Sequence, residues 1–172
     1  MKIGILSDSH LKVDYTKEAI TFLKNKGVKY LIHAGDLCVE ENLKLLKESN
    51  LPYVSVFGNN DSSLLQFAFK YNIEKEPHYF KIEDIKFKLM HMPFYLIGDT
   101  DVVIFGHTHT FASEYKNKTL FLNPGEVCAR EKPYIEFALL EINENEYIIH
   151  HYSKEESTKN FKEEEIIYER EN

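Results

Sequence analysis

Apolar runs that alternate with amphipathic segments are the feature that most constrains how the first 71 residues can fold. Each run has the length of a short buried strand, and each amphipathic segment repeats its apolar side chains at helical spacing. The predicted strands cover residues 2–7, 30–34 and 53–56, and the predicted helices cover residues 15–26, 41–49 and 62–71. Gly27 is a helix stop and Ser62 a candidate helix cap. Alternating strands and helices form right-handed βαβ units, so this half predicts a largely parallel sheet.

The second half of the chain has a different pattern, in which helical spacing nearly disappears. Its predicted strands cover residues 79–82, 85–90, 102–105, 113–116, 119–122, 135–142 and 146–152. Glu83, Asp84 and Asn117 are typical of tight turns, so antiparallel hairpins should dominate. Residues 159–170 are expected to form a terminal helix. Together the halves predict an α/β fold in which two sheets face each other and the helices lie outside.

Length and charge narrow the class of protein. A chain of 172 residues buries one core and divides poorly into two, so residues 1–172 are interpreted as a single domain. The 28 acidic residues outnumber the 21 basic ones, and the resulting net charge of −7 disfavours binding to long nucleic acids. Charge runs concentrate after Ser153, and we expect the tail at about 153–172 to be a solvated face or a frayed end.

Cysteine usage and the N-terminal sequence bear on where the protein works. Cys38 and Cys128 lie far apart and outside any Cys-x-x-Cys pattern, which suits a reducing compartment and argues against a disulfide framework. The chain starts directly with a predicted strand, and it contains no apolar run of the ~18 residues that a membrane span needs. We therefore expect a cytoplasmic protein with no membrane partner.

Carboxylate, amide and imidazole side chains gather just after the predicted strands. They are Asp8, His10, Asp36, Asn59, Asn60, Asp61, His91, His107 and His109. Strands of an open α/β sheet share one ligand-binding edge at their carboxyl ends, so these residues are expected to converge. Such donors suit Mn²⁺ first, with Ni, Fe, Co or Zn as alternatives, and Asp36 is the best candidate to bridge two ions ~4 Å apart.

The order of these motifs resembles the calcineurin-like metallophosphoesterase superfamily, in which Asp-x-His, Gly-Asp, Gly-Asn-x-Asp, a lone His and Gly-His-x-His follow one another. The motif Gly-Asn-x-Asp and the segment Asn123-Pro124-Gly125 are similar to its small single-domain bacterial and archaeal phosphodiesterase branch. The resemblance covers roughly residues 1–152. It implies a four-layer αββα sandwich of two mixed sheets, and a phosphodiesterase that hydrolyses small phosphate esters through a hydroxide bridging two metals.

The resemblance also implies roles for individual residues. The first metal would be bound by Asp8, His10, Asp36 and His109, and the second by Asp36, Asn59, His91 and His107. Asp36, Asn59, Asn60 and His107 would be the catalytic residues. Asn60 stands where many relatives place a histidine that protonates the leaving group, and an amide cannot do this. We therefore expect slow turnover of poor leaving groups and a preference for diesters or activated esters.

A second departure lies between the ligands His91 and His107. Residues 92–105 replace a longer, partly helical insertion that relatives usually carry. His91 is followed by Met92 and Pro93 instead of the common Gly-His, so His91 is the least secure ligand. We expect a more open cleft here. A partner subunit could cover it through Phe94, Tyr95 and Leu96, so a homo-oligomer is the candidate assembly.

Structural roles compete with functional ones for several of these residues. Asp8 and Asp36 could cap helices and Asn59 could occupy a turn, but such roles do not call for four imidazoles after strands. Four other candidates, His33, His78, His150 and His151, are interpreted as packing, surface or supporting residues. Asn123, Pro124 and Gly125 should form a turn that borders the site. Arg130 is either solvated or in contact with a phosphate.

Two other functions remain open from the sequence. A eukaryotic trafficking subunit with this fold is a protein-binding scaffold that has lost key histidines, whereas this chain keeps every ligand of the pattern. A nuclease acting on large DNA needs further domains and a basic surface. The sequence does not select among cyclic nucleotides, small diesters and monoesters as substrates.

Overall fold

The computed structural model describes residues 1–171, and its order of elements begins with the alternation that the sequence predicts. The strands of the first half are β1 (Lys2–Leu6), β2 (Tyr30–His33), β3 (Tyr53–Val56) and β4 (Ile73–Glu74). Its helices are α1 (Val13–Asn25), α2 (Glu40–Glu48) and the 3₁₀-helix η1 (Ser62–Phe67). The later elements are β5 (His78–Ile82), β6 (Ile85–Leu89), the 3₁₀-helix η2 (Pro93–Tyr95), β7 (Val102–Ile104), β8 (Ala112–Lys116), β9 (Thr119–Asn123), β10 (Tyr134–Ile142), β11 (Glu146–Glu155) and β12 (Lys162–Glu169).

The first sheet contains seven strands in the order β12-β11-β10-β1-β2-β3-β4. Strands β1 to β4 run parallel, because each intervening helix returns the chain to the same end of the sheet. Strands β10, β11 and β12 continue the sheet in antiparallel pairs. The parallel half confirms the βαβ prediction.

The second sheet contains five strands in the order β5-β6-β7-β9-β8. β5 with β6 and β8 with β9 form antiparallel hairpins, as predicted from their turn residues. Glu83 and Asn117 in these turns have positive φ angles of 52° and 51°. β7 runs parallel to both of its neighbours. Both sheets are therefore mixed, which confirms the predicted fold class.

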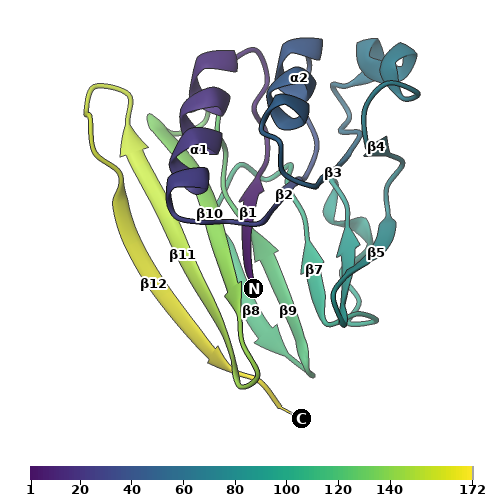
Figure 1. Cartoon of the computed structure of the whole chain (residues 1–172), viewed down its shortest axis with the longest axis vertical. Coiled ribbons are helices and arrows are strands. Elements are labelled where there is room, and N and C mark those ends of the chain that lie inside the picture. The colour runs from purple at the N-terminus through teal and green to yellow at the C-terminus, as the bar shows by residue number, and fades with distance from the viewer. Residues whose placement is uncertain (172) are drawn as a thin grey trace.

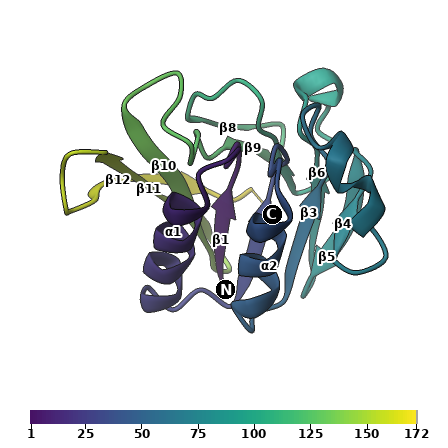
Figure 2. The same ribbon diagram turned by 90° about the horizontal axis from the view of Figure 1, so that it is seen from above.

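Two apolar layers hold the sheets and helices together. Ile5 and Ile32 of the first sheet pack with Leu89, Ile104 and Leu122 of the second, and all five side chains are buried. α1 and α2 lie against the other face of the first sheet (Figures 1 and 2). Their apolar side chains are buried there. Among residues 1–171, no helix has the length and apolar character needed to cross a membrane.

The C-terminal segment is a strand, so the predicted terminal helix at residues 159–170 is wrong. Side chains alternate between the two faces of a strand, so Ile166 and Tyr168 of β12 turn toward the core between the sheets while Ile167 is exposed. The Tyr168 hydroxyl donates a hydrogen bond to the Ser113 carbonyl on β8. The tail is thus an ordered edge strand rather than a frayed end, although its acidic residues are solvated as expected.

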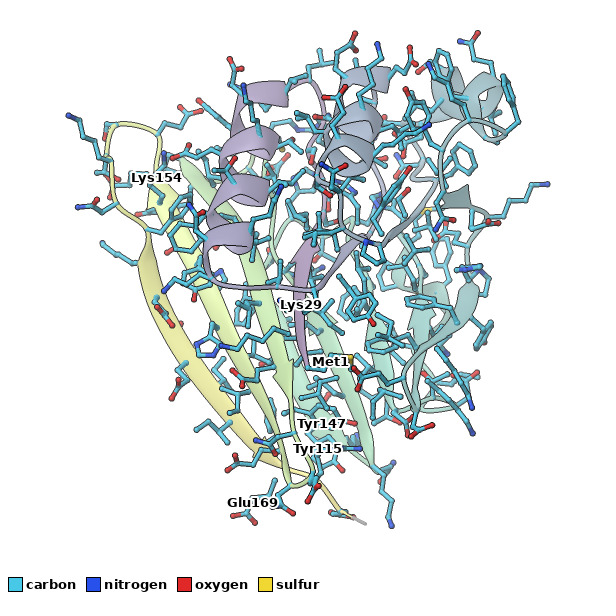
Figure 3. All side chains as sticks on the ribbon, in the orientation of Figure 1. Met1, Lys29, Tyr115, Tyr147, Lys154 and Glu169 are labelled. Carbon is cyan, nitrogen blue, oxygen red and sulfur yellow. The ribbon has the colours of Figure 1, made fainter. Side chains whose placement is uncertain are left out.

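Contacts at both ends of β11 tie this edge to the rest of the molecule. At one end, the ring of Tyr147 lies against that of Tyr115 on β8, with centroids 5.7 Å apart. At the other end, Lys154 Nζ donates to both carboxylate oxygens of Glu18 on α1, at 2.6 and 2.7 Å. Figure 3 labels Lys154 at the end opposite the two tyrosines. β11 therefore joins the second sheet to the helical layer.

The helix predicted at residues 62–71 is a short 3₁₀-helix, η1, followed by a turn and the unpredicted strand β4. Ser62 lies inside η1, and its N-cap position belongs to Asp61. The carboxylate of Asp61 accepts backbone N–H groups from Cys38 and Gly58 instead of capping the helix. The predicted Ser62 cap is therefore wrong. The residue at the N-cap position is Asp61, and its side chain holds two neighbouring loops together.

Among residues 1–171, the only helical cover on the outer face of the second sheet is the three-residue η2. The buried Lys88 Nζ lies 2.6 Å from Asp99 Oδ1 and donates to the Ile97 carbonyl, which holds residues 93–101 against the sheet. Phe94 is 72% exposed and Leu96 is 42% exposed, while the side chain of Tyr95 lies outside the described part of the structure. The proposal that a partner subunit covers this region stays a prediction.

The inter-sheet core makes a prediction about stability. Leu140 on β10 is fully buried in this core, whereas Leu65 in η1 is 58% exposed. Leu140→Ala should lower the free energy of unfolding by ~2–5 kcal/mol, because it removes buried methyl groups and leaves a cavity. Leu65→Ala is the matched control and should cost under about 1 kcal/mol. Denaturant unfolding measures both, and equal losses would contradict the packing described here.

Candidate metal centre

Loops at the carboxyl ends of five strands meet at one edge of the sandwich, the upper edge in Figure 1. These loops follow β1, β2, β3, β6 and β7. Together they bring seven predicted ligands into one cluster: Asp8, His10, Asp36, Asn59, His91, His107 and His109. The predicted convergence of residues separated by about a hundred positions is therefore present in the fold.

Asp36 lies between two groups of side chains. Its Oδ2 atom is 3.6 Å from His10 Nε2 and 3.5 Å from His91 Nε2. Asn60 fixes the carboxylate from a third direction, because its backbone N–H donates to Oδ1 at 2.9 Å and its side-chain amide donates to Oδ2 at 2.7 Å. This is the position that a carboxylate shared by two cations would need.

The first group contains Asp8, His10 and His109. Asp8 is fully buried, and its Oδ1 atom is 3.3 Å from His109 Nε2. Asp8 Oδ2 accepts hydrogen bonds from Ser7 Oγ at 2.6 Å and from the backbone N–H of His107 at 3.1 Å. Asp8 Oδ1 and His10 Nε2 are both buried without a hydrogen-bond partner. Buried polar atoms are normally paired, so these two unpaired atoms fit the role of ligands to a bound cation.

The second group contains Asn59, His91 and His107. Asn59 Oδ1 lies 3.0 Å from His91 Nε2 and 3.1 Å from His107 Nδ1. The two imidazole nitrogens are 3.3 Å from each other. On its other side, His91 Nδ1 donates to the Ala34 carbonyl at 2.8 Å, so Nε2 is the nitrogen that faces Asp36 and Asn59. His91, the least secure ligand of the sequence pattern, is thus fully buried and aimed at the cluster.

Backbone strain concentrates at these ligands. Among the described residues, eleven other than glycine have positive φ, and five of them are candidate ligands: Asp8, His10, Asp36, His107 and His109. A non-glycine residue in this region costs ~1–3 kcal/mol and persists only where the surroundings enforce it. The loops are also tightly nested, since a Cβ atom on Gly58 would collide with Asp36 Oδ1 and one on Gly106 with Ser7 Oγ. Strain of this kind is typical of functional sites.

The electrostatic environment of the cluster favours positive charge. Burial alone would lower the pKa of His91, but the hydrogen bond with Asp36 and the charge of Asp8 outweigh it and raise the pKa to about 9. Burial would raise the pKa of Asp36, but hydrogen bonds from His91 and Asn60 hold it below its ordinary value. Burial raises the pKa of Asp8. The carboxylates are therefore placed where a cation would compensate their charge.

The other histidines lie outside the cluster, as the sequence predicts. His33 is buried, with Nε2 2.7 Å from Ser9 Oγ, and burial lowers its pKa to about 3. His78 stacks on Phe80. His150 Nδ1 is 2.8 Å from Glu163 Oε1, and His151 stacks on Phe111.

Asn123 and Arg130 border the site from the second half of the chain. Asn123 Nδ2 donates to the Gly106 carbonyl and to Thr108 Oγ1, both at 3.0 Å, so the predicted bordering turn is confirmed. Arg130 lines a cavity of about 360 Å³ together with the candidate ligands Asp36, Asn59, His107 and His109. Its side chain is 59% exposed and lies 3.3 Å from Glu131.

Glu126 is a site residue that the sequence analysis missed. Its carboxylate is fully buried and pairs with His109 Nδ1, opposite the nitrogen that faces Asp8. Burial would raise the pKa of Glu126, but the His109 hydrogen bond and the Lys132 backbone N–H lower it to about 2. Its place directly after Asn123-Pro124-Gly125 was the available signal, because that turn was already expected to border the site.

The chain is similar to known proteins over most of its length. A model of the calcineurin-like phosphoesterase superfamily domain matches residues 1–145. A phosphodiesterase of Methanocaldococcus jannaschii is 30% identical over 160 residues, which cover 86% of this chain and 96% of that protein. A solved structure described as a novel archaeal phosphodiesterase has a TM-score of 0.72 at 26% identity, covering 98% of this chain and 100% of that chain.

A further solved structure shares the fold. Vacuolar protein sorting 29 from Cryptosporidium parvum has a TM-score of 0.76 at 21% identity, covering 96% of this chain and 97% of that chain. The matched family model runs through every motif from Asp8 to Asn123. The chain belongs to the calcineurin-like phosphoesterase superfamily.

Proposed function

We propose that the protein is a metal-dependent phosphodiesterase that hydrolyses small phosphate esters with two divalent cations. The observation that carries this proposal is the meeting of two donor groups at Asp36. The first group is Asp8, His10, Asp36 and His109, and the second is Asp36, Asn59, His91 and His107. Relatives named phosphodiesterase, in an archaeon and in Escherichia coli, support the diester assignment.

The protein's own contribution is to hold the donors in place before the substrate arrives. When bound, the cations supply Lewis acidity and lower the pKa of the attacking water. Asp36 is kept in position by Asn60, and His91 by the Ala34 carbonyl. Carboxylate, amide and imidazole donors suit Mn²⁺ first, with Ni, Fe, Co or Zn as alternatives.

Asn60 shapes the preference among substrates. Its side-chain amide already donates to Asp36, so it orients the shared carboxylate and cannot protonate a leaving group. Esters whose leaving groups need no protonation should therefore react fastest. This supports small aryl or activated diesters over alkyl monoesters.

Two alternative functions receive less support. The likeness to vacuolar protein sorting 29 is below 25% identity, so it speaks for the fold and not for a scaffold role. A scaffold also has no need of buried, unpartnered atoms such as Asp8 Oδ1 and His10 Nε2. The net charge of −7 disfavours long nucleic acids as substrates.

Metal binding should stabilise the fold. Mn²⁺ at a hundred times its dissociation constant adds ~2.7 kcal/mol per site to the free energy of unfolding. For a chain of this size this corresponds to a rise of roughly 5–10 °C in the melting temperature. Asp36→Ala should lose most of the rise, whereas the exposed Asp84→Asn should keep it. A melting temperature that Mn²⁺ leaves unchanged in the wild type would contradict the metal centre.

Restoring an acid at position 60 should change selectivity. Asn60→His is expected to raise the rate on an alkyl phosphate ester relative to an aryl ester by at least about tenfold, because only the alkyl leaving group needs a proton. The ratio of the two rates is the measurement, since it cancels any general loss from the changed contact with Asp36. An unchanged ratio would show that the missing acid does not set the preference.

Arg130 should contribute to substrate binding. Arg130→Ala is expected to raise KM for an aryl phosphodiester roughly tenfold, with kcat nearly unchanged, because a charged hydrogen bond to phosphate contributes ~1.5–3 kcal/mol. Arg170→Ala is the matched control, since Arg170 bonds the Asn143 carbonyl instead of lining this cavity. Equal KM values for the wild type and Arg130→Ala would place Arg130 among solvated surface residues.

A further inference from the structure

We propose that Glu126 is a positioning residue that orients His109 for cation binding and ties it to the loop that carries Arg130. The inference rests on the proposed function in one respect, because it takes His109 as a ligand. It adds a residue from outside the ligand motifs and a connection between the centre and the substrate side of the cavity.

The Glu126 carboxylate is fully buried and receives hydrogen bonds on both oxygens. Oε2 accepts from His109 Nδ1 and from Cys128 Sγ, the latter at 3.2 Å. Oε1 accepts the backbone N–H groups of Glu131 at 2.9 Å and Lys132 at 2.8 Å. A buried carboxylate with donors on both oxygens is held in one orientation, so it can hold its partners in turn.

The contact with His109 selects the tautomer of the ring. In a neutral imidazole one nitrogen is a donor and the other carries the lone pair. A carboxylate against Nδ1 makes that nitrogen the donor, which leaves the lone pair on Nε2. Nε2 faces Asp8 Oδ1, which is 3.3 Å away and has no hydrogen-bond partner. Glu126 therefore orients the His109 ring so that Nε2 faces the same point as Asp8 Oδ1, as supporting carboxylates do for metal-bound histidines.

Backbone contacts anchor Glu126 to the centre from behind. The N–H groups of Val127 and Cys128 donate to the carbonyls of Ser7 and Asp8, both at 3.0 Å. The Glu126 carbonyl accepts the N–H of Glu136 at 2.8 Å. The segment that begins with Glu126 thus lies beside the residues that follow β1, including the candidate ligand Asp8. Because this backbone is fixed, a shift of the Glu126 side chain should move the ring of His109.

The contacts of Oε1 extend the effect to the substrate side. Ala129 has a positive φ of 52°, which turns the chain so that Arg130 lines the cavity while Glu131 and Lys132 point their N–H groups back to Glu126. One carboxylate therefore holds both an imidazole of the centre and the turn that presents the arginine. Loss of its charge should weaken cation binding and substrate binding together.

Glu126→Gln is the sharpest test because it keeps the shape and removes the charge. The glutamine amide has one acceptor and one donor end, so it cannot accept from both His109 Nδ1 and the two backbone N–H groups. Glu136→Gln is the matched control, since Glu136 is also buried beside a histidine, His151, which lies outside the cluster. Glu126→Asp keeps the charge and tests rescue if the glutamine variant folds poorly.

Three measurements on the purified protein decide the proposal. Nitrogen-15 spectra of histidine in the metal-free protein should show the proton of His109 on Nδ1 in the wild type and shifted away from Nδ1 in Glu126→Gln. Titration with Mn²⁺ should show one site weakened by ~10–100-fold in Glu126→Gln, partly restored in Glu126→Asp and unchanged in Glu136→Gln. KM for an aryl phosphodiester should rise in Glu126→Gln.

The proposal would be overturned if Glu126→Gln kept the His109 tautomer and the Mn²⁺ affinity of the wild type. It would also be overturned if Glu136→Gln lost as much Mn²⁺ affinity as Glu126→Gln. Absence of Mn²⁺ binding in the wild type would overturn it as well. A wild-type protein that binds two cations but hydrolyses no ester would refute the phosphodiesterase assignment alone, because the tautomer and affinity results would still support Glu126.

Discussion

Asp36 is the side chain on which both halves of the candidate centre depend, because it stands within 3.6 Å of imidazoles from two groups of donors. A carboxylate can serve two cations only if its position is fixed, and two hydrogen bonds from Asn60 fix it. Burial works against a charge here, yet the bonds from His91 and Asn60 keep the pKa of Asp36 below its ordinary value. The charge of this carboxylate is thus maintained by the same contacts that aim it.

The fold sustains this arrangement through rigidity. Five of the candidate ligands have a strained backbone, and strained backbone persists only where its surroundings are stable. That stability comes from the core between the sheets, in which Ile5 of β1 and Leu122 of β9 are fully buried. The polar layer above the core includes Glu126 and Asp61, two buried carboxylates that hold neighbouring loops through backbone N–H groups. The candidate ligands are therefore supported by an apolar core and held in orientation by two carboxylates outside the ligand set.

The sequence predicted the parts of this protein that repeat a strong pattern. Apolar periodicity identified the parallel strands, and the rule that strand ends share an edge placed Asp8 and His109 together although a hundred residues separate them. The charges of β12 are equally compatible with a helix, and only pairing with β11 decides for a strand. Glu126 follows a turn that was expected to border the site, but the sequence does not show that its carboxylate is buried against the His109 ring.

Anomalous diffraction from crystals of the Mn²⁺-loaded protein tests the central claim most directly. Two peaks ~4 Å apart, one on each side of the Asp36 carboxylate, are predicted, because each donor group should hold one ion and share that side chain. The first peak should lie between Asp8 and His109, and the second between Asn59 and His91. A single ion that does not contact Asp36, or ions bound only at surface carboxylates, would contradict the account.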